Sequence, residues 1–205
     1  MGFNKSKSDE STLYIKVVDD DLIVISLYVD DLFVTGNNQK YAREVLKKFH
    51  MESCKSVNTP LSQNEKFSKD DGAEEVDETA YRSIIGCLMF LTAITPDIMF
   101  PVSLLSRFMH CASELHYTAA KRILRYIKGT LDYGLKFEKT KKLFLHGYSD
   151  SDWAGSSDDM RSTSGYFFSF GSGCFSWSST KQDVVVQSTA EAEYVAAALT
   201  VNQSL

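Results

Sequence analysis

The chain opens with short apolar stretches separated by polar residues, a pattern typical of β-strands. β-Branched and aromatic residues dominate these stretches, which cover residues 13–18, 22–29 and 32–34. Asp19, Asp20 and Asp21 separate the first two stretches, and we interpret them as an ordinary acidic turn. Asp30 and Asp31 separate the last two. The pattern therefore predicts a hairpin with these two carboxylates at its tip.

Helical patterns follow. A short helix is expected over Tyr41–Met51 and an apolar helix over Tyr81–Ile94, after which Thr95-Pro96 can cap and start another. Between the first two helices, residues 61–80 carry seven acids and two lysines among few large apolar residues. This composition predicts a flexible connection.

A third helical pattern is amphipathic, with Ser113 near its start and Gly129 at its end. One face carries the apolar residues Ala120, Ile123, Leu124 and Ile127. The opposite face carries Lys121, Arg125 and Lys128. An ordinary solvated face and a nucleic-acid contact both explain such a basic stripe.

The last third returns to strand patterns. Asp150 ends a strand, residues 166–170 and 174–178 suggest a hairpin, and "DVVVQ" at 183–187 suggests another strand. A helix then starts at Ser188 and Glu191, which form a capping-box pattern, with Glu193 just beyond. Asp150 and Asp152 are explained equally well as turn residues, and Glu191 as a cap. A strand-end aspartate and a helix-start glutamate can nevertheless converge over a sheet edge.

Composition limits the classes of protein to consider. With 205 residues, 43% of them hydrophobic, the chain can bury the core of one large domain or two small ones. Its net charge of -5 is unusual for a nucleic-acid binder. Residues 102–142, however, hold nine Lys or Arg against three acids, which makes this window +6. Any nucleic-acid surface should be local to it.

No apolar stretch approaches the length of a membrane span, and residues 1–10 are too polar for a signal peptide. The four cysteines show no CxxC pair or nearby histidine spacing. They suggest reduced thiols of an intracellular protein, in cytoplasm or nucleus, and we expect no zinc.

Adjacent carboxylates on a rigid hairpin suit one reaction in particular. Phosphoryl transfer with two Mg²⁺ ions needs oxygen ligands close together, because the ions clamp the attacking and leaving oxygens of the phosphate. Asp is also a common turn residue, so Asp30 and Asp31 taken alone are better explained as a turn. The surrounding Tyr-Val-Asp-Asp motif, however, resembles the catalytic hairpin of the reverse transcriptase palm.

Further blocks extend this resemblance over nearly the whole chain. They are "SLYVDDLFVTGNN", "YRSIIGCLMFLTAITPDIMFPVSLLSRFMH", "HYTAAKRILRYIKGT", "YSDSDWAGSSDDMRSTSGY" and "QSTAEAEYVAAA". In this order they resemble the Pol polyprotein of plant copia-type retrotransposons, from the end of the reverse transcriptase through a helical connection to ribonuclease H.

The resemblance implies an α+β chain with five parts. They are a palm remnant (1–38), a short helical segment (39–60), the acidic linker (61–80), a helical connection (81–140) and a ribonuclease H-like mixed α/β sheet (141–205). It also implies Mg²⁺ as cofactor and RNA, DNA or an RNA–DNA hybrid as partner, together with longer copies of the same polyprotein. Asp30 and Asp31 match the polymerase metal pair, with Asp30 favoured as direct ligand, and Asp150 and Glu193 match the first two ribonuclease H carboxylates.

The chain also departs from the family pattern. No block before Asp30 resembles the earlier palm strand that supplies another aspartate, and the fingers are not matched. The family has a longer stretch after Gly36-Asn37-Asn38, which indicates an internal deletion, and its later ribonuclease H aspartates would follow Leu205. Both metal sites are therefore expected to be incomplete.

We expect a catalytically inactive fragment that binds nucleic acid weakly through Lys121, Arg125 and Lys128. Residual magnesium-dependent ribonuclease H activity of Asp150 and Glu193 is the alternative. An incomplete sheet should also leave apolar side chains partly exposed and one edge strand open to association. The apolar side chains in question are Tyr166, Phe168, Val184 or Val186.

Overall fold

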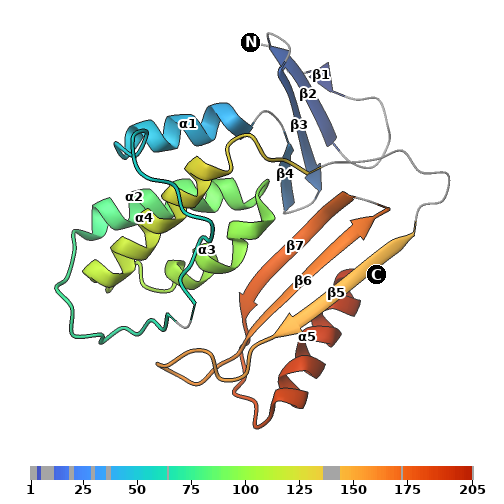
Figure 1. Ribbon diagram of the computed structural model, residues 1–205. Coiled ribbons are helices and arrows are strands. Elements are labelled where there is room, and N and C mark those ends of the chain that lie inside the picture. The colour runs from blue at the N-terminus through green and yellow to red at the C-terminus, as the bar shows by residue number, and fades with distance from the viewer. Residues whose placement is uncertain are drawn as a thin grey trace.

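The computed structural model describes the chain in eight stretches, residues 4–5, 12–18, 21–28, 31–35, 38–63, 65–135, 144–171 and 173–204. A strand region, a helical region and a second strand region follow one another along the chain (Figure 1). Antiparallel strands and helices thus occupy separate parts of the sequence, as in the expected α+β class.

The first sheet contains the predicted hairpins. Its four antiparallel strands lie in sequence order and are β1 (Asn4–Lys5), β2 (Thr12–Val18), β3 (Asp21–Tyr28) and β4 (Asp31–Thr35). Val18 pairs with Asp21 across the acidic turn, and Tyr28 pairs with Asp31 in the second hairpin. The turn residues themselves, 19–20 and 29–30, lie outside the described residues.

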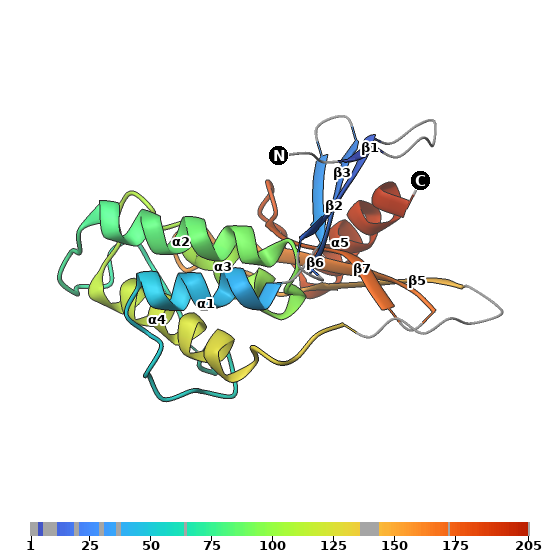
Figure 2. The ribbon, with the colours of Figure 1, turned by 90° about the horizontal axis from the view of Figure 1, so that it is seen from above.

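The helices gather on one side of the second sheet (Figure 2). They are α1 (Asn38–Lys48), α2 (Glu78–Thr92), the short 3₁₀ helix η1 (Pro96–Ile98), α3 (Met99–Ser106) and α4 (Glu114–Gly129). The predicted helices are confirmed, although α1 and α2 each begin three residues earlier than expected. No helix in the described part of the chain has the length and apolar character needed to cross a membrane.

These helices share one core, formed by the apolar faces of α1, α2, α3 and α4. On α4 the buried face consists of the four residues that the amphipathic pattern assigned to it, Ala120, Ile123, Leu124 and Ile127. Burial of such a stripe stabilises a helix that is otherwise polar.

The acidic segment 61–80, whose composition predicts a flexible connection, packs against this core. The Phe67 ring is buried against Phe108 and His116, which stack on each other, with centroid distances of 6.3 and 5.5 Å from Phe67. Further along, the Val76 N–H donates to the Ala112 carbonyl at 3.0 Å. One apolar anchor and backbone pairing are enough to hold the segment, although its average composition is that of a linker.

The second sheet has three antiparallel strands in the order β5 (Leu145–Ser151), β6 (Thr163–Phe170) and β7 (Gly173–Lys181). The predicted hairpin is confirmed as β6 and β7, both longer than expected. Helix α5 (Thr189–Ser204) packs on one face of this sheet, against β5 and β6. β5 is therefore an outer strand with a helix beneath it.

The strand predicted over 183–187 is wrong. The structure has no strand there, because these residues connect the end of β7 to the start of α5 and must turn the chain onto the face of the sheet. Val184 and Val185 are 53% and 58% exposed, whereas Val186 is buried. Phe168 is also buried, so the expected exposure applies to Val184 but not to Phe168 or Val186.

Candidate metal-binding carboxylates and nucleic-acid interface

The candidate polymerase pair falls at the β3–β4 connection. Asp31 is the first residue of β4, while Asp30 lies outside the described residues. The backbone of the flanking strands is thus the predicted hairpin. The placement of the two carboxylates relative to an ion stays a prediction.

The two aspartates of the "SDSDW" stretch have different surroundings. Asp152 fixes a turn, because its carboxylate accepts a hydrogen bond from the Thr163 N–H while its own N–H donates to the Thr163 carbonyl at 3.2 Å. A side chain at Gly155 would overlap the Asp152 carboxylate, so glycine is required there. Asp150, in contrast, is exposed, and its carboxylate makes none of the side-chain hydrogen bonds or ion pairs found among the described residues. Asp152 therefore has the structural role, and Asp150 is available for chemistry.

Two glutamates at the start of α5 differ in the same way as Asp152 and Asp150: Glu191 has a structural role, and Glu193 does not. The Ser188 hydroxyl accepts from the Glu191 N–H at 3.2 Å, and the Glu191 carboxylate accepts from the Gln187 N–H at 2.8 Å. This is the expected cap, with the glutamate reaching one residue further back than in the standard capping box. Glu193 is exposed, and within the described part of the chain its carboxylate has no hydrogen bond or ion pair.

Gln182 shows which face of the sheet α5 covers. Its buried amide nitrogen lies 3.2 Å from the Ser151 hydroxyl, 2.8 Å from the Ser164 hydroxyl and 3.1 Å from the Ala192 carbonyl of α5. Ser151 and Ser164 therefore face α5. Because side chains alternate along a strand, Asp150 points to the opposite face.

Asp150 and Glu193 thus come from neighbouring elements but leave on opposite sides of the sheet. An ion shared by them would have to lie around the outer edge of β5. Among the described residues, no three His, Cys, Asp or Glu side chains are grouped as a metal site. Two carboxylate oxygens from this pair suit Mg²⁺ by type, since Mg²⁺ prefers oxygen ligands, but water or substrate oxygens would have to complete an octahedral shell.

The basic stripe of α4 is partly covered by the segment that follows α1. Arg125 donates from Nε to the Lys55 carbonyl at 2.8 Å, and the neighbouring Arg122 donates from Nη2 to the Thr59 hydroxyl at 2.9 Å. The ammonium of Lys121 lies 4.0 Å from the centre of the Tyr117 ring. Lys121, Arg125 and Lys128 are all half-buried. The three basic residues do lie on the outer face of α4, but some of their N–H groups already have partners within the protein, so only the remaining ones are free to bind a phosphate.

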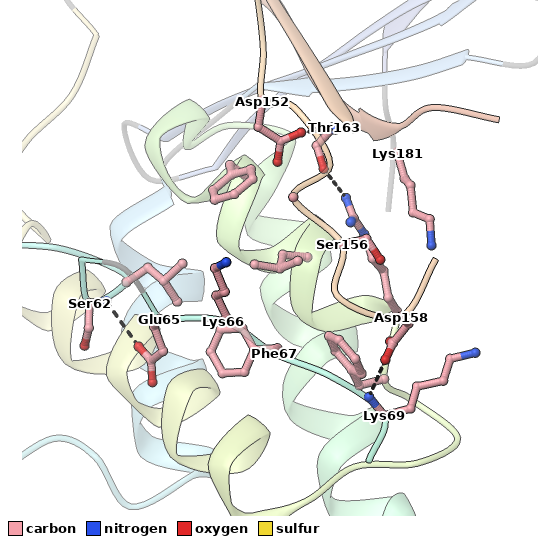
Figure 3. A pocket seen from close by; sticks show the side chains of 16 residues that line it. Ser62, Glu65, Lys66, Phe67, Lys69, Asp152, Ser156, Asp158, Thr163 and Lys181 are labelled. Carbon is pink, nitrogen blue, oxygen red and sulfur yellow. Dashed lines mark hydrogen bonds between the residues drawn. The ribbon is translucent and has the colours of Figure 1, made fainter. Parts of the chain in front are cut away.

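A polar pocket of about 400 Å³ lies between the acidic segment, α3 and the loop after β5 (Figure 3). Lys66 points into it. Arg107 also lines the pocket and contributes a donor that the sequence analysis missed. Arg107 donates to the Thr163 hydroxyl at 2.9 Å, and burial lowers the pKa of this guanidinium, opposed by Asp152 and Asp159. The pocket is lined by residues from distant segments, so no local motif marks it. Its lining carries four cationic side chains and three carboxylates, so the opposite charges nearly cancel, as expected of a junction between two parts of a fold.

A buried Ser113–His116–Asp71 group has the residue types of a hydrolase triad. The Ser113 hydroxyl donates to Asp71 at 2.5 Å, and His116 Nδ1 accepts from the Ser113 N–H at 3.0 Å. The hydroxyl oxygen also lies 2.8 Å from His116 Nδ1, but that nitrogen already accepts from the Ser113 N–H, so the hydroxyl proton goes to the carboxylate. Burial lowers the pKa of His116, opposed by Asp71. These residues cap α4 and hold the acidic segment, and the burial of Ser113 and His116 leaves no access for a substrate.

Comparison with known proteins finds extended sequence similarity. The chain is 36% identical over 236 residues to the retrovirus-related Pol polyprotein from transposon RE1 of Arabidopsis thaliana, and 32% identical over 244 residues to that from transposon TNT 1-94 of Nicotiana tabacum. These matches cover 95% and 94% of the chain but 16% and 18% of the polyproteins, so the chain spans about a sixth of their length. It is also 38% identical over 178 residues to an uncharacterized mitochondrial protein of Arabidopsis thaliana, covering 87% of the chain and 73% of that protein.

The two polyprotein alignments, at 236 and 244 positions, are longer than the 205-residue chain. The polyproteins therefore carry residues within the matched region that this chain does not have, as an internal deletion requires. No model of a protein family and no solved structure matches the chain.

Proposed function

The chain belongs to the Pol polyproteins of copia-type retrotransposons, and from this premise we propose that it is a nucleic-acid-binding segment that does not catalyse either reaction of the family by itself. In this proposal β3 and β4 correspond to the polymerase hairpin, residues 81–140 to the connection, and residues 141–205 to a ribonuclease H-like domain. The natural ligand is an RNA–DNA hybrid or one of its strands, and Mg²⁺ is the metal of both ancestral sites.

The observation that carries the proposal is the placement of the two free candidate carboxylates, Asp150 and Glu193, on opposite sides of the second sheet. Asp152 and Glu191 are engaged in local hydrogen bonds, whereas Asp150 and Glu193 are exposed at the positions that match the ribonuclease H carboxylates. Two carboxylates on opposite sides of β5 supply too little negative charge to hold two Mg²⁺ ions a few Å apart. Two-metal hydrolysis places its ions about 3.5–4 Å from each other, so their mutual repulsion must be compensated by the ligands.

Hybrid cleavage tests the absence of catalysis. We expect no cleavage of the RNA strand of an RNA–DNA hybrid by the purified chain with Mg²⁺ or Mn²⁺. Cleavage that disappears in Asp150→Asn would overturn the proposal and support the alternative, a residual magnesium-dependent ribonuclease H. The exposed and unpaired state of Asp150 and Glu193 is what keeps this alternative in view.

Primer extension tests the polymerase half. We expect none on an RNA template with a DNA primer, because nucleotide and template binding need more than a hairpin. Extension that is lost in Asp30→Asn would show a working polymerase site.

Salt-dependent binding tests the nucleic-acid contact. Neutralising about three phosphates should give a slope of log K against log salt of roughly -2 to -3. Reversing the charge of Lys121, Arg125 and Lys128 to Glu should remove most of the affinity. Reversal of Lys40, Arg43 and Lys47 on α1 makes the same change in net charge and should leave most of it. Equal losses in both triple variants would exclude α4 as the contact surface.

A further inference from the structure

The outer strand β5 has few of the features that normally protect a sheet edge. It pairs with β6 on one side, and no other strand in the described residues pairs with it (Figure 1). Residues 145–150 are exposed. Natural edge strands are usually short, bulged, charged or interrupted by Pro, whereas β5 has seven residues without Pro, Lys or Arg, and Asp150 is its one carboxylate. The one register shift of this sheet lies between β6 and β7.

The sequence of β5, Leu-His-Gly-Tyr-Ser-Asp-Ser, is complementary to itself when two copies run antiparallel. With Tyr148 opposite Tyr148 of a second copy, His146 lies opposite Asp150 of that copy, and Asp150 lies opposite its His146. An imidazole N–H can donate to a carboxylate in either protonation state of the histidine. Twofold symmetry thus provides two favourable polar pairs from one contact.

The other central registers are less favourable. Centring the pairing on Ser149 places Asp150 opposite Tyr148, and centring it on Gly147 places His146 opposite Tyr148. Neither register places the Asp150 carboxylate opposite an imidazole N–H. Of these three registers, only the arrangement about Tyr148 pairs His146 and Asp150 with each other.

The two faces of β5 also fit this arrangement. Ser151 faces α5 through Gln182. Because side chains alternate along a strand, the face opposite α5 carries His146, Tyr148 and Asp150. The polar pairs and tyrosines therefore lie on the open face. There Tyr148 already stacks on Phe167 with a centroid distance of 4.6 Å and an interplanar angle of 15°, and both rings are exposed. A second Tyr148 would lengthen this aromatic row. The small residues Gly147 and Ser149 meet on the other face, beneath which both α5 helices lie.

We propose that this chain forms a symmetric dimer through antiparallel pairing of β5 with β5 of a second copy, centred on Tyr148. The joined sheet has six strands, and each copy closes the exposed edge of the other. The two Asp150 side chains are then about 14 Å apart along the strands, at about 3.4 Å per residue, so they do not form a joint metal site. Pairing instead covers the edge around which Asp150 and Glu193 would share an ion.

Sedimentation of the full chain tests the charge pairing. The wild type should dimerise, and His146→Asp should raise the dimer dissociation constant roughly 5- to 30-fold, because two cross-strand pairs become repulsive. Asp150→His should also raise the constant, because both cross-strand pairs then lose their carboxylate acceptor. Combining both substitutions places an imidazole donor opposite a carboxylate again, in swapped positions, and the constant should return to about the wild-type value. His110→Asp makes the same chemical change away from β5 and should leave the constant unchanged.

Cross-linking tests the register independently. Under mild oxidation, Tyr148→Cys should give a disulfide between the two introduced thiols, identified as a linked peptide by mass spectrometry. Ser149→Cys is the matched control, because residue 149 lies opposite Gly147 of the second copy and not opposite itself. Circular dichroism verifies that each variant is folded. A monomeric wild type at high concentration, a charge swap without recovery, or equal cross-linking at residue 149 would each overturn the proposal.

Discussion

Phe67 is the residue whose removal best tests how the acidic segment is held. It lines the pocket of Figure 3 and is 6% exposed. Its ring lies against Phe108 and His116 in the core of the helical region. Truncating a buried phenylalanine to alanine typically costs about 3–5 kcal/mol, from lost burial and the cavity left behind. The acidic segment can relax into part of that cavity, so we expect about 3 kcal/mol for Phe67→Ala.

Urea denaturation followed by far-UV circular dichroism measures this loss. With a slope of about 2 kcal/mol per M, a change of about 3 kcal/mol lowers the urea midpoint by about 1.5 M. Phe90→Ala is the matched control, because Phe90 is 49% exposed and packs by its edge against Tyr41. Its truncation should cost about 1 kcal/mol or less, judged from the area that it loses.

Trypsin provides the second measurement, since Lys66 and Lys69 flank the anchor. In the wild type the peptide bonds after Lys66 and Lys69 should resist trypsin under conditions that preserve the fold, because the backbone must leave the core to enter the protease active site. In Phe67→Ala cleavage at both lysines should be much faster. Equal midpoints for the two phenylalanine variants, together with rapid cleavage of the wild type, would refute the packed segment and restore the flexible connection that the composition predicts.

Three further predictions concern pH and local packing. Burial lowers the pKa of His116, so on acidification the unfolded chain takes up the proton first, and the urea midpoint should fall from pH 7 to 5. His116→Gln should flatten this fall, whereas His110→Gln should leave it unchanged. Burial tends to raise the pKa of Asp159, but hydrogen bonds from Lys181 and others hold that pKa at about 2. The ionised carboxylate should therefore stabilise the fold fully above about pH 4, and this stabilisation should be lost toward pH 2. Thermal melts of Asp159→Asn should not show this pH dependence. Gly155→Ala should lower the melting temperature by several degrees, since its Cβ would overlap the Asp152 carboxylate, whereas Gly86→Ala, whose Cβ meets nothing within 4 Å, should not.

The spacing of apolar residues in the sequence correctly predicted those helices and strands that bury one continuous face along their whole length. Helix α4 has one continuous apolar face and an N-terminal serine, so burial and capping reinforce one another, and both its ends fall within a residue of the expected positions. The β6–β7 hairpin is similar, because its aromatic residues and its central glycines mark strands and turn separately.

The same reasoning failed where a single contact outweighs the local average. The acidic segment is polar in composition, yet Phe67 and a few backbone hydrogen bonds bind it to the core. The valine run at 183–187 has high β-propensity, but only seven residues separate the end of β7 from the start of α5, and they are needed for the turn. The polar pocket could not be expected, because Lys66, Arg107 and Lys181 lie far apart in sequence and converge only through packing.

The comparison of Asp150 with Asp152 bears on how candidate catalytic residues are recognised. The two are close in sequence and equal in chemistry, and the sequence pattern alone explains either as a turn residue. Asp152 holds the Thr163 backbone and requires glycine at position 155, so the fold itself accounts for its presence. Asp150 has no such contact among the described residues and would still allow β5 to form if it were replaced by a neutral polar residue. With the protein dilute enough to be monomeric, Asp150→Asn should leave the urea midpoint nearly unchanged, whereas Asp152→Asn should lower it. This difference measures which of the two carboxylates the fold of a single copy requires.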